Sequence, residues 1–132
     1  MPDQETLERA EQDKREGKSP STQAGEFVRE EIHHIREGKH GAASAKQAVA
    51  IGLSKARRAG VELPPPKKGR VSEETRKAAQ RDSRRGRSGQ KKVSARRSRS
   101  SEAALKREPR AAASHKALSR QAKSAARRRK AA

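Results

Sequence analysis

Lysine and arginine are the residues of this sequence with the clearest chemistry, because they gather in short clusters along its second half. Their ammonium and guanidinium groups donate hydrogen bonds to phosphate oxygens, and a cationic chain releases the counterions condensed on a nucleic acid. The clusters therefore predict contact with a phosphate backbone. The candidate nucleic-acid-binding residues are Lys67, Lys68, Arg70, Arg84, Arg85, Arg87, Lys91, Lys92, Arg96, Arg97, Arg99, Lys106, Arg107, Arg110, Arg127, Arg128, Arg129 and Lys130, with Lys55, Arg57 and Arg58 as a smaller additional group.

The charge of the chain is concentrated at one end. The 132 residues carry a formal net charge of +19. Residues 1–66 hold 11 basic and 11 acidic residues, whereas residues 67–132 hold 24 basic and 5 acidic residues. Such an asymmetry indicates a neutral module followed by a basic segment that binds a polyanion.

The second half has no aromatic residue on which the bases of a single strand could stack, and no RNA-binding or zinc-finger signature is present. We therefore expect a non-enzymatic DNA-binding protein of the nucleoid-associated type, with little sequence specificity and with duplex DNA favoured over RNA. One alternative is an adaptor whose basic segment binds an acidic protein or ribosomal RNA. Another is a plasmid-maintenance or antitoxin-like regulator that reads sequence.

Several classes of protein are disfavoured by composition. The absence of cysteine excludes disulfides, thiolate metal sites and cysteine nucleophiles. Leu, Ile, Val and Phe total only 14 residues, too few for a domain with a closed pocket. We expect no enzyme activity, no cofactor and no small-molecule substrate. No apolar run approaches the roughly 18 residues of a membrane helix, so we expect no membrane contact and a cytoplasmic location.

Histidine is the remaining residue type that could bind a metal ion. His33 and His34 are adjacent, and His40 follows a few residues later. Neighbouring residues on a helix point about 100° apart, so His33 and His34 cannot easily share one ion. We expect solvent-facing histidines and no metal site.

The elements that must position these residues are helices. Ser19-Pro20 is a helix-entry signal and Ser44 with Gln47 is a capping box, so the sequence predicts helices at about 20–37 and 45–59. Their apolar faces are too small to be stable alone, which predicts self-association or docking through this hairpin. The expected interaction core consists of Phe27, Val28, Ile32, Ile35, Val49, Leu53 and Val61.

The whole chain is expected to be mostly α, with a short two-helix hairpin as its only compact part. The predicted layout is a charged N-terminal segment at 1–18 that forms a fraying helix, the hairpin module at 19–63, a proline linker at 64–66, and a basic tail at 67–132. Because the apolar face of the tail is mostly alanine and too thin to bury much, we expect the tail to be largely disordered and only potentially helical.

Residues Lys46–Gly60 read KQAVAIGLSKARRAG. This run resembles the signature KQAxAIxLSxARxAG of a family of small bacterial proteins of unknown function, and Val28–Gly41 occupies the leading part of the family's pattern. The resemblance implies a bacterial source, which places the expected location at the bacterial nucleoid, and it implies no established activity. In composition alone, the tail resembles linker-histone tails and bacterial histone-like proteins.

Overall fold

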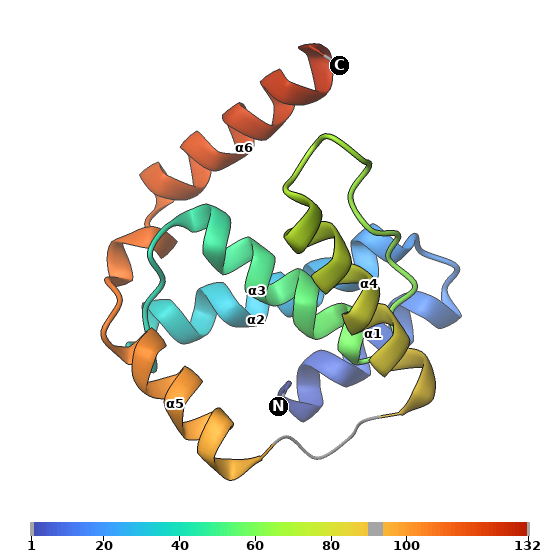
Figure 1. The fold of residues 1–132 in the computed structure, drawn as a ribbon, viewed down its shortest axis with the longest axis horizontal. Coiled ribbons are helices and arrows are strands. Elements are labelled where there is room, and N and C mark those ends of the chain that lie inside the picture. Colours follow the sequence, from blue (N-terminus) through green and yellow to red (C-terminus); the bar gives the residue numbers. More distant parts are fainter. Residues whose placement is uncertain (1, 90–93, 132) are drawn as a thin grey trace. The chain divides into compact units, whose positions relative to one another are not determined.

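The computed structural model describes residues 2–89 and 94–131, and this part of the chain is mostly helical (Figure 1). The helices are α1 (Gln4–Arg15), α2 (Pro20–Arg36), α3 (Ala45–Arg58), α4 (Glu73–Ser88), α5 (Ala95–Lys106), the short 3₁₀ helix η1 (Arg110–Ala113) and α6 (His115–Ala131). None of these helices is long and apolar enough to cross a membrane.

The expectation of a two-helix hairpin with a disordered tail is wrong. Helices α2 and α3 lie where they were predicted, but α4, α5, η1 and α6 occupy most of the supposed tail. Serine caps explain where α4, α5 and α6 begin. The Oγ atoms of Ser72, Ser94 and Ser114 accept hydrogen bonds from backbone N–H groups three residues later, at 3.1–3.2 Å.

The buried residues explain why the composition was misleading. Among the described residues, nine of the twelve buried hydrophobic residues are alanines, and the three larger ones are Phe27, Ile35 and Val61. A count of Leu, Ile, Val and Phe omits alanine, although alanine has the highest helix propensity and lets helices approach closely. The basic second half is rich in alanine, so it forms helices with a thin apolar face.

The chain divides into two compact units, each built from two separate segments. Residues 1–30 and 51–92 contain the first unit, and residues 31–50 and 93–132 contain the second. Helices α2 and α3 therefore contribute residues to both units.

The core of the first unit surrounds Phe27, whose exposed fraction is 1%. Ala24, Ala56 and Val61 are buried around it, and Leu53 packs against them. Helices α2 and α3 are in close contact here. A Cβ atom on Gly52 would lie 2.6 Å from the Cα atom of Val28, so only glycine fits at this position.

Helix α1 belongs to this core and does not fray as expected. Ala10 is buried in the same cluster and Leu7 packs against it. The buried hydroxyl of Thr6 donates a hydrogen bond to Oε1 of Glu30 at 3.2 Å. The prediction was wrong because the partners of α1 are distant in sequence and the helix shows only a short apolar stripe of its own.

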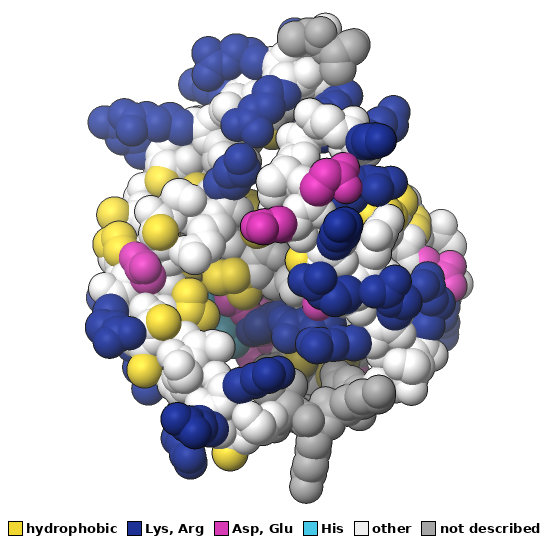
Figure 2. Space-filling view, in the orientation of Figure 1, with side chains coloured by type: hydrophobic (Ala, Val, Ile, Leu, Met, Phe, Trp, Pro, Cys, Tyr) yellow, Lys and Arg dark blue, Asp and Glu magenta, His cyan; other side chains and the backbone are white. Residues whose placement is uncertain are grey.

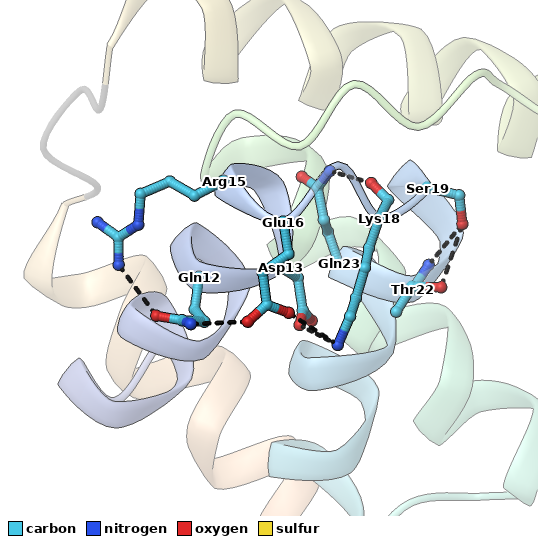
Figure 3. A network of polar contacts seen from close by, with 8 residues as sticks. All are labelled: Gln12, Asp13, Arg15, Glu16, Lys18, Ser19, Thr22 and Gln23. Atoms are coloured by element: carbon cyan, nitrogen blue, oxygen red, sulfur yellow. Dashed lines mark hydrogen bonds and ion pairs between the residues drawn. The ribbon is translucent and has the colours of Figure 1, made fainter.

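The turn between α1 and α2 is held by polar contacts (Figure 3). The Nζ atom of Lys18 lies 3.3 Å from Oδ1 of Asp13 and 3.2 Å from Oε2 of Glu16. Hydrogen bonds from Gln12 and from Lys18 lower the pKa of Glu16, and hydrogen bonds to Glu16 and Asp13 raise the pKa of Lys18. Gly17 ends the helix in the left-handed conformation, with φ of 75°.

Helix α4 completes the first unit by packing on the end of α3. Ala79 is buried, and a Cβ atom on Gly86 would lie 2.0 Å from the carbonyl oxygen of Arg57. The hydroxyl of Ser54 donates a hydrogen bond to Oδ2 of Asp82 at 2.6 Å. These contacts fix the orientation of α4 within the unit.

The core of the second unit is formed by Ile35 together with four alanines, which are Ala42, Ala48, Ala112 and Ala113. The loop between α2 and α3 is hydrogen-bonded to residues at the end of α5 and just before η1, which are distant in the sequence. Backbone N–H groups of Gly41 and Ala42 donate to the carbonyl oxygens of Leu105 and Pro109, at 2.8 and 3.0 Å.

The residues of the expected interaction core are thus distributed over two cores. Phe27, Leu53 and Val61 belong to the first cluster, whereas Ile32 and Ile35 belong to the second. Val28 packs against Gly52. Val49 is half-buried and lies in neither cluster.

Candidate nucleic-acid interface

Helix α4 presents a row of cations on one face. Lys77, Arg81, Arg84 and Arg85 are separated by four, three and one residues, so they share a face of the helix. All four side chains are exposed. The opposite face carries the buried Ala79. We call these four residues the α4 stripe.

Helix α6 carries a longer and more regular row. Its cations follow a spacing of four, three, four and three residues, which keeps them within one face over 14 residues, or about 21 Å of helix. The helix contains no acidic residue. The α6 stripe consists of Lys116, Arg120, Lys123, Arg127 and Lys130, all of them exposed.

The other residues of α6 are consistent with a stripe that faces solvent. Half-buried side chains lie on the other side of the helix, including Ala117, Leu118, Gln121 and Ala125. Arg128 and Arg129 are exposed but lie outside the α6 stripe, and Arg129 is on the opposite face of the helix. One face of α6 is therefore formed by exposed cations, and most of its half-buried side chains lie on the opposite face.

Both stripes contain residues that the search for charge clusters missed. Lys77 and Arg81 on α4, and Lys116, Arg120 and Lys123 on α6, stand outside the longer cation clusters of the sequence and share a face only when the helix forms. The signal that indicates them in the sequence is the helical period of about 3.6 residues among the cations themselves.

The remaining predicted cations near α4 and α5 are mostly exposed. Lys67, Lys68 and Arg70 lie in a turn around Gly69, where the N–H of Arg70 donates to the carbonyl of Lys67 at 3.1 Å. Arg96, Arg97 and Arg99 lie on α5, which has no buried residue, and Arg107 caps its C-terminus. Lys106 pairs with Glu102 at 3.3 Å. Lys91 and Lys92 lie outside the described residues.

Arg57 is not available to a nucleic acid. It is 7% exposed, and its guanidinium donates hydrogen bonds to the carbonyl oxygens of Leu63 and Pro64, at 3.3 and 2.9 Å. Burial lowers its pKa. Arg57 therefore fixes the proline-containing loop to the end of α3, and it leaves the set of candidate binding residues.

Three further candidates have partners within the protein. The Nζ atom of Lys55 lies 4.0 Å from Oε2 of Glu30, and Nε of Arg58 lies 3.9 Å from Oδ1 of Asp82. Arg110 donates to the carbonyl oxygen of Ile35 at 3.3 Å and also to that of Arg36. These two carbonyls belong to the last turn of α2, so Arg110 caps that helix.

A hollow of about 550 Å³ lies between α4 and the loop at Gly60–Pro65. Leu63, Pro64 and Pro65 line one side, and Arg84 and Arg87 line the other. Arg84 of the α4 stripe therefore shares this hollow with Arg87, another of the predicted cations, and with three apolar residues of the loop.

The exposed surface of the described residues is correspondingly basic. Figure 2 shows Lys and Arg side chains over much of one face, with few acidic side chains among them. Exposed cations retain all their hydrogen-bond donors for an external anion. The stripes can therefore contact a series of phosphates without any rearrangement of the helices that carry them.

Comparison with known proteins covers only part of the chain. Residues 14–68 match the model of DUF6496, a family of unknown function. The match includes α2 and α3, whereas α4, α5 and α6 lie beyond it. No curated protein and no solved structure matches the chain. The chain is thus similar to an uncharacterised family over its less basic half, and the similarity assigns no activity to the cationic helices.

Proposed function

We propose that this protein is a non-enzymatic DNA-binding protein that contacts the phosphate backbone of a duplex through the cationic faces of α4 and α6. The observation that carries the proposal is the α6 stripe, in which five exposed cations share one face and no acidic residue interrupts them. Its fixed geometry distinguishes it from a merely basic composition.

The spacing of the stripe suits a polyanion of high charge density. Successive cations lie about 5–6 Å apart along the helix axis, and duplex DNA carries one negative charge per about 1.7 Å of its axis. Several phosphates are therefore within reach of each helix. Binding releases condensed counterions, which supplies the free energy without a shaped interface.

The same surface contains little that could read a base sequence. The stripes consist of Lys and Arg, so guanine is the one base for which they offer a specific partner in the major groove. Contacts to phosphates position a protein but carry no sequence information. Weak sequence preference follows, as does the nucleoid-associated character that we propose for the protein.

Salt-titrated binding of the full chain tests this proposal. Two duplexes of equal length and unrelated sequence, and one structured RNA, are labelled and titrated by fluorescence anisotropy between 50 and 200 mM salt. If about six to ten phosphates are contacted, the affinity falls roughly 10³–10⁵-fold over that range, equally for both duplexes. A strong preference for one duplex, tighter binding to the RNA, or a salt-independent affinity would each contradict the proposal.

A further inference from the structure

A cluster of side chains that could bind a metal ion lies in the second unit, at the C-terminal end of α2. Ligand-type atoms of Glu31, His34 and His40 all lie within 4.8 Å of one another. Glu31 is fully buried at 0% exposure, and the side chain of His40 is 12% exposed. A buried carboxylate beside two imidazoles is costly unless positive charge compensates it.

The local sequence explains how these three residues meet. Glu31 and His34 are one turn apart on α2 and therefore share a face of that helix. Gly38 ends the helix in the left-handed conformation, with φ of 80°, and the N–H of Lys39 donates to the carbonyl of His34 at 2.9 Å. This turn reverses the chain and brings His40 back beside His34.

The rings of His34 and His40 are close neighbours, and one nitrogen of each lies within 4.8 Å of the other and of a carboxylate oxygen of Glu31. Their centroids lie 6.1 Å apart and their planes are inclined by 81°. His33, the residue adjacent to His34, is exposed instead. The expectation that no metal site exists considered the adjacent pair His33 and His34, and the structure pairs His34 with His40.

The hydrogen bonding of His40 favours a cation in the cluster. Its Nδ1 atom lies 2.9 Å from the carbonyl oxygen of Gly41. A carbonyl only accepts hydrogen bonds, so Nδ1 carries the hydrogen and the lone pair of a neutral ring is on Nε2. That Nε2 atom lies 3.2 Å from Oε2 of Glu31, which is also an acceptor. Two acceptors at this distance need positive charge between them, either a proton or a metal ion.

We propose that Glu31, His34 and His40 bind a divalent transition-metal ion, with Zn²⁺ as the preferred occupant. Imidazole nitrogen and carboxylate oxygen are zinc ligands, and a set of three protein ligands plus water completes a tetrahedron. The contact from Nδ1 of His40 to the Gly41 carbonyl is the arrangement that orients metal-binding histidines in proteins. A proton shared by His40 and Glu31 would engage two of the three ligand-type atoms, whereas a metal ion would engage all three.

Bound metal would stabilise the loop between α2 and α3. The ion would connect the last turns of α2 to His40, and the next two residues, Gly41 and Ala42, are hydrogen-bonded to Leu105 and Pro109. The site therefore joins the helix end to the segment that closes the second unit. The inference does not depend on the proposed binding of DNA.

Zinc titration of the full chain, prepared without a polyhistidine tag and free of nucleic acid, tests this site. We expect one equivalent of Zn²⁺ to bind, measured by competition with a chromophoric chelator, and one equivalent of Co²⁺ to give the intense visible absorption of a tetrahedral complex. Excess Mg²⁺ should not compete. Failure of the protein to bind a stoichiometric equivalent of either metal would overturn the proposal.

Variants locate the ligands. His40→Ala and His34→Ala should each weaken Zn²⁺ binding by about tenfold or more, whereas the matched control His33→Ala should leave it unchanged. Circular dichroism of each apoprotein establishes that the helices persist. If both ligand variants lose helicity, Glu31→Gln, which keeps the size of the buried side chain, must show the same loss of affinity. Equal affinities for His33→Ala and the ligand variants would refute the site.

Discussion

The α6 stripe leads to a quantitative prediction about DNA binding. In the triple variant Lys116→Ala, Arg120→Ala and Lys123→Ala, three exposed cations on one face are removed. Alanine has the highest helix propensity, so the helix itself should persist. The variant therefore tests the charged face and not the fold.

The expected magnitude follows from counterion release. Each phosphate contact contributes about 0.9 to the slope of log K against log salt, so losing three contacts reduces the slope by about 2.7. Relative to binding at 1 M salt, this difference amounts to about 500-fold weaker affinity at 0.1 M salt, or about 4 kcal/mol. At high salt, the variant and the wild type should converge.

The control removes the same charge from elsewhere. Lys14, Arg15 and Arg29 are exposed residues of α1 and α2, and their triple replacement by alanine lowers the net charge by the same three units. Fluorescence anisotropy with one labelled duplex, repeated at several salt concentrations, compares the two variants. If the control weakens binding as much as the α6 variant does, net charge alone determines affinity and the geometric argument is refuted. An unchanged slope in the α6 variant would refute it as well.

Four further substitutions test the fold by urea unfolding. Gly52→Ala should destabilise the protein by about 1–3 kcal/mol, because the new Cβ atom would lie 2.6 Å from the Cα atom of Val28. The matched control is Gly25→Ala, whose Cβ atom would meet no atom within 4 Å; this change should stabilise the protein by up to about 1 kcal/mol. A stabilising Gly52→Ala would contradict the close approach of α2 and α3. Ser72→Ala should cost about 1 kcal/mol by removing the cap of α4, and no loss would mean that the cap is unimportant. Arg57→Met should cost about 1–3 kcal/mol by leaving two carbonyl groups without their donor, without changing DNA affinity; a large loss of affinity would return Arg57 to the binding surface.

Local signals in the sequence were sufficient to locate α2 and α3. The N–H of Gln47 donates to Oγ of Ser44 at 3.1 Å, as the capping box predicts. At the other end of α3, the N–H of Val61 donates to the carbonyl of Ala56 at 3.0 Å, as expected for the turn around Gly60. These contacts lie within a few residues of each other, so the sequence alone could predict them.

The tertiary structure depends on contacts that no local pattern reveals. Leu7 and Ala10 of α1 reach the core around Phe27, and the carbonyl of Leu105 accepts a hydrogen bond from Gly41. Each pairing joins segments that are far apart in the chain. The candidate interface was predicted only in part. Consecutive cations such as Arg127–Arg129 are visible in the sequence, whereas Lys116 and Arg120 share a face only once the helix has formed.

The division of each unit into two sequence-distant segments has a consequence for fragments of this protein. A polypeptide ending at Pro66 would keep α2 and α3 but would lose Gly86 of α4, which packs against the carbonyl of Arg57. It would also lose the carbonyl groups of Leu105 and Pro109, which accept hydrogen bonds from the α2–α3 loop. The second core would lose Ala112 and Ala113, whereas the members of the first core all lie before Pro66. The cationic half is therefore an integral part of the folded protein, and its contribution to binding must be measured by surface substitutions in the intact chain.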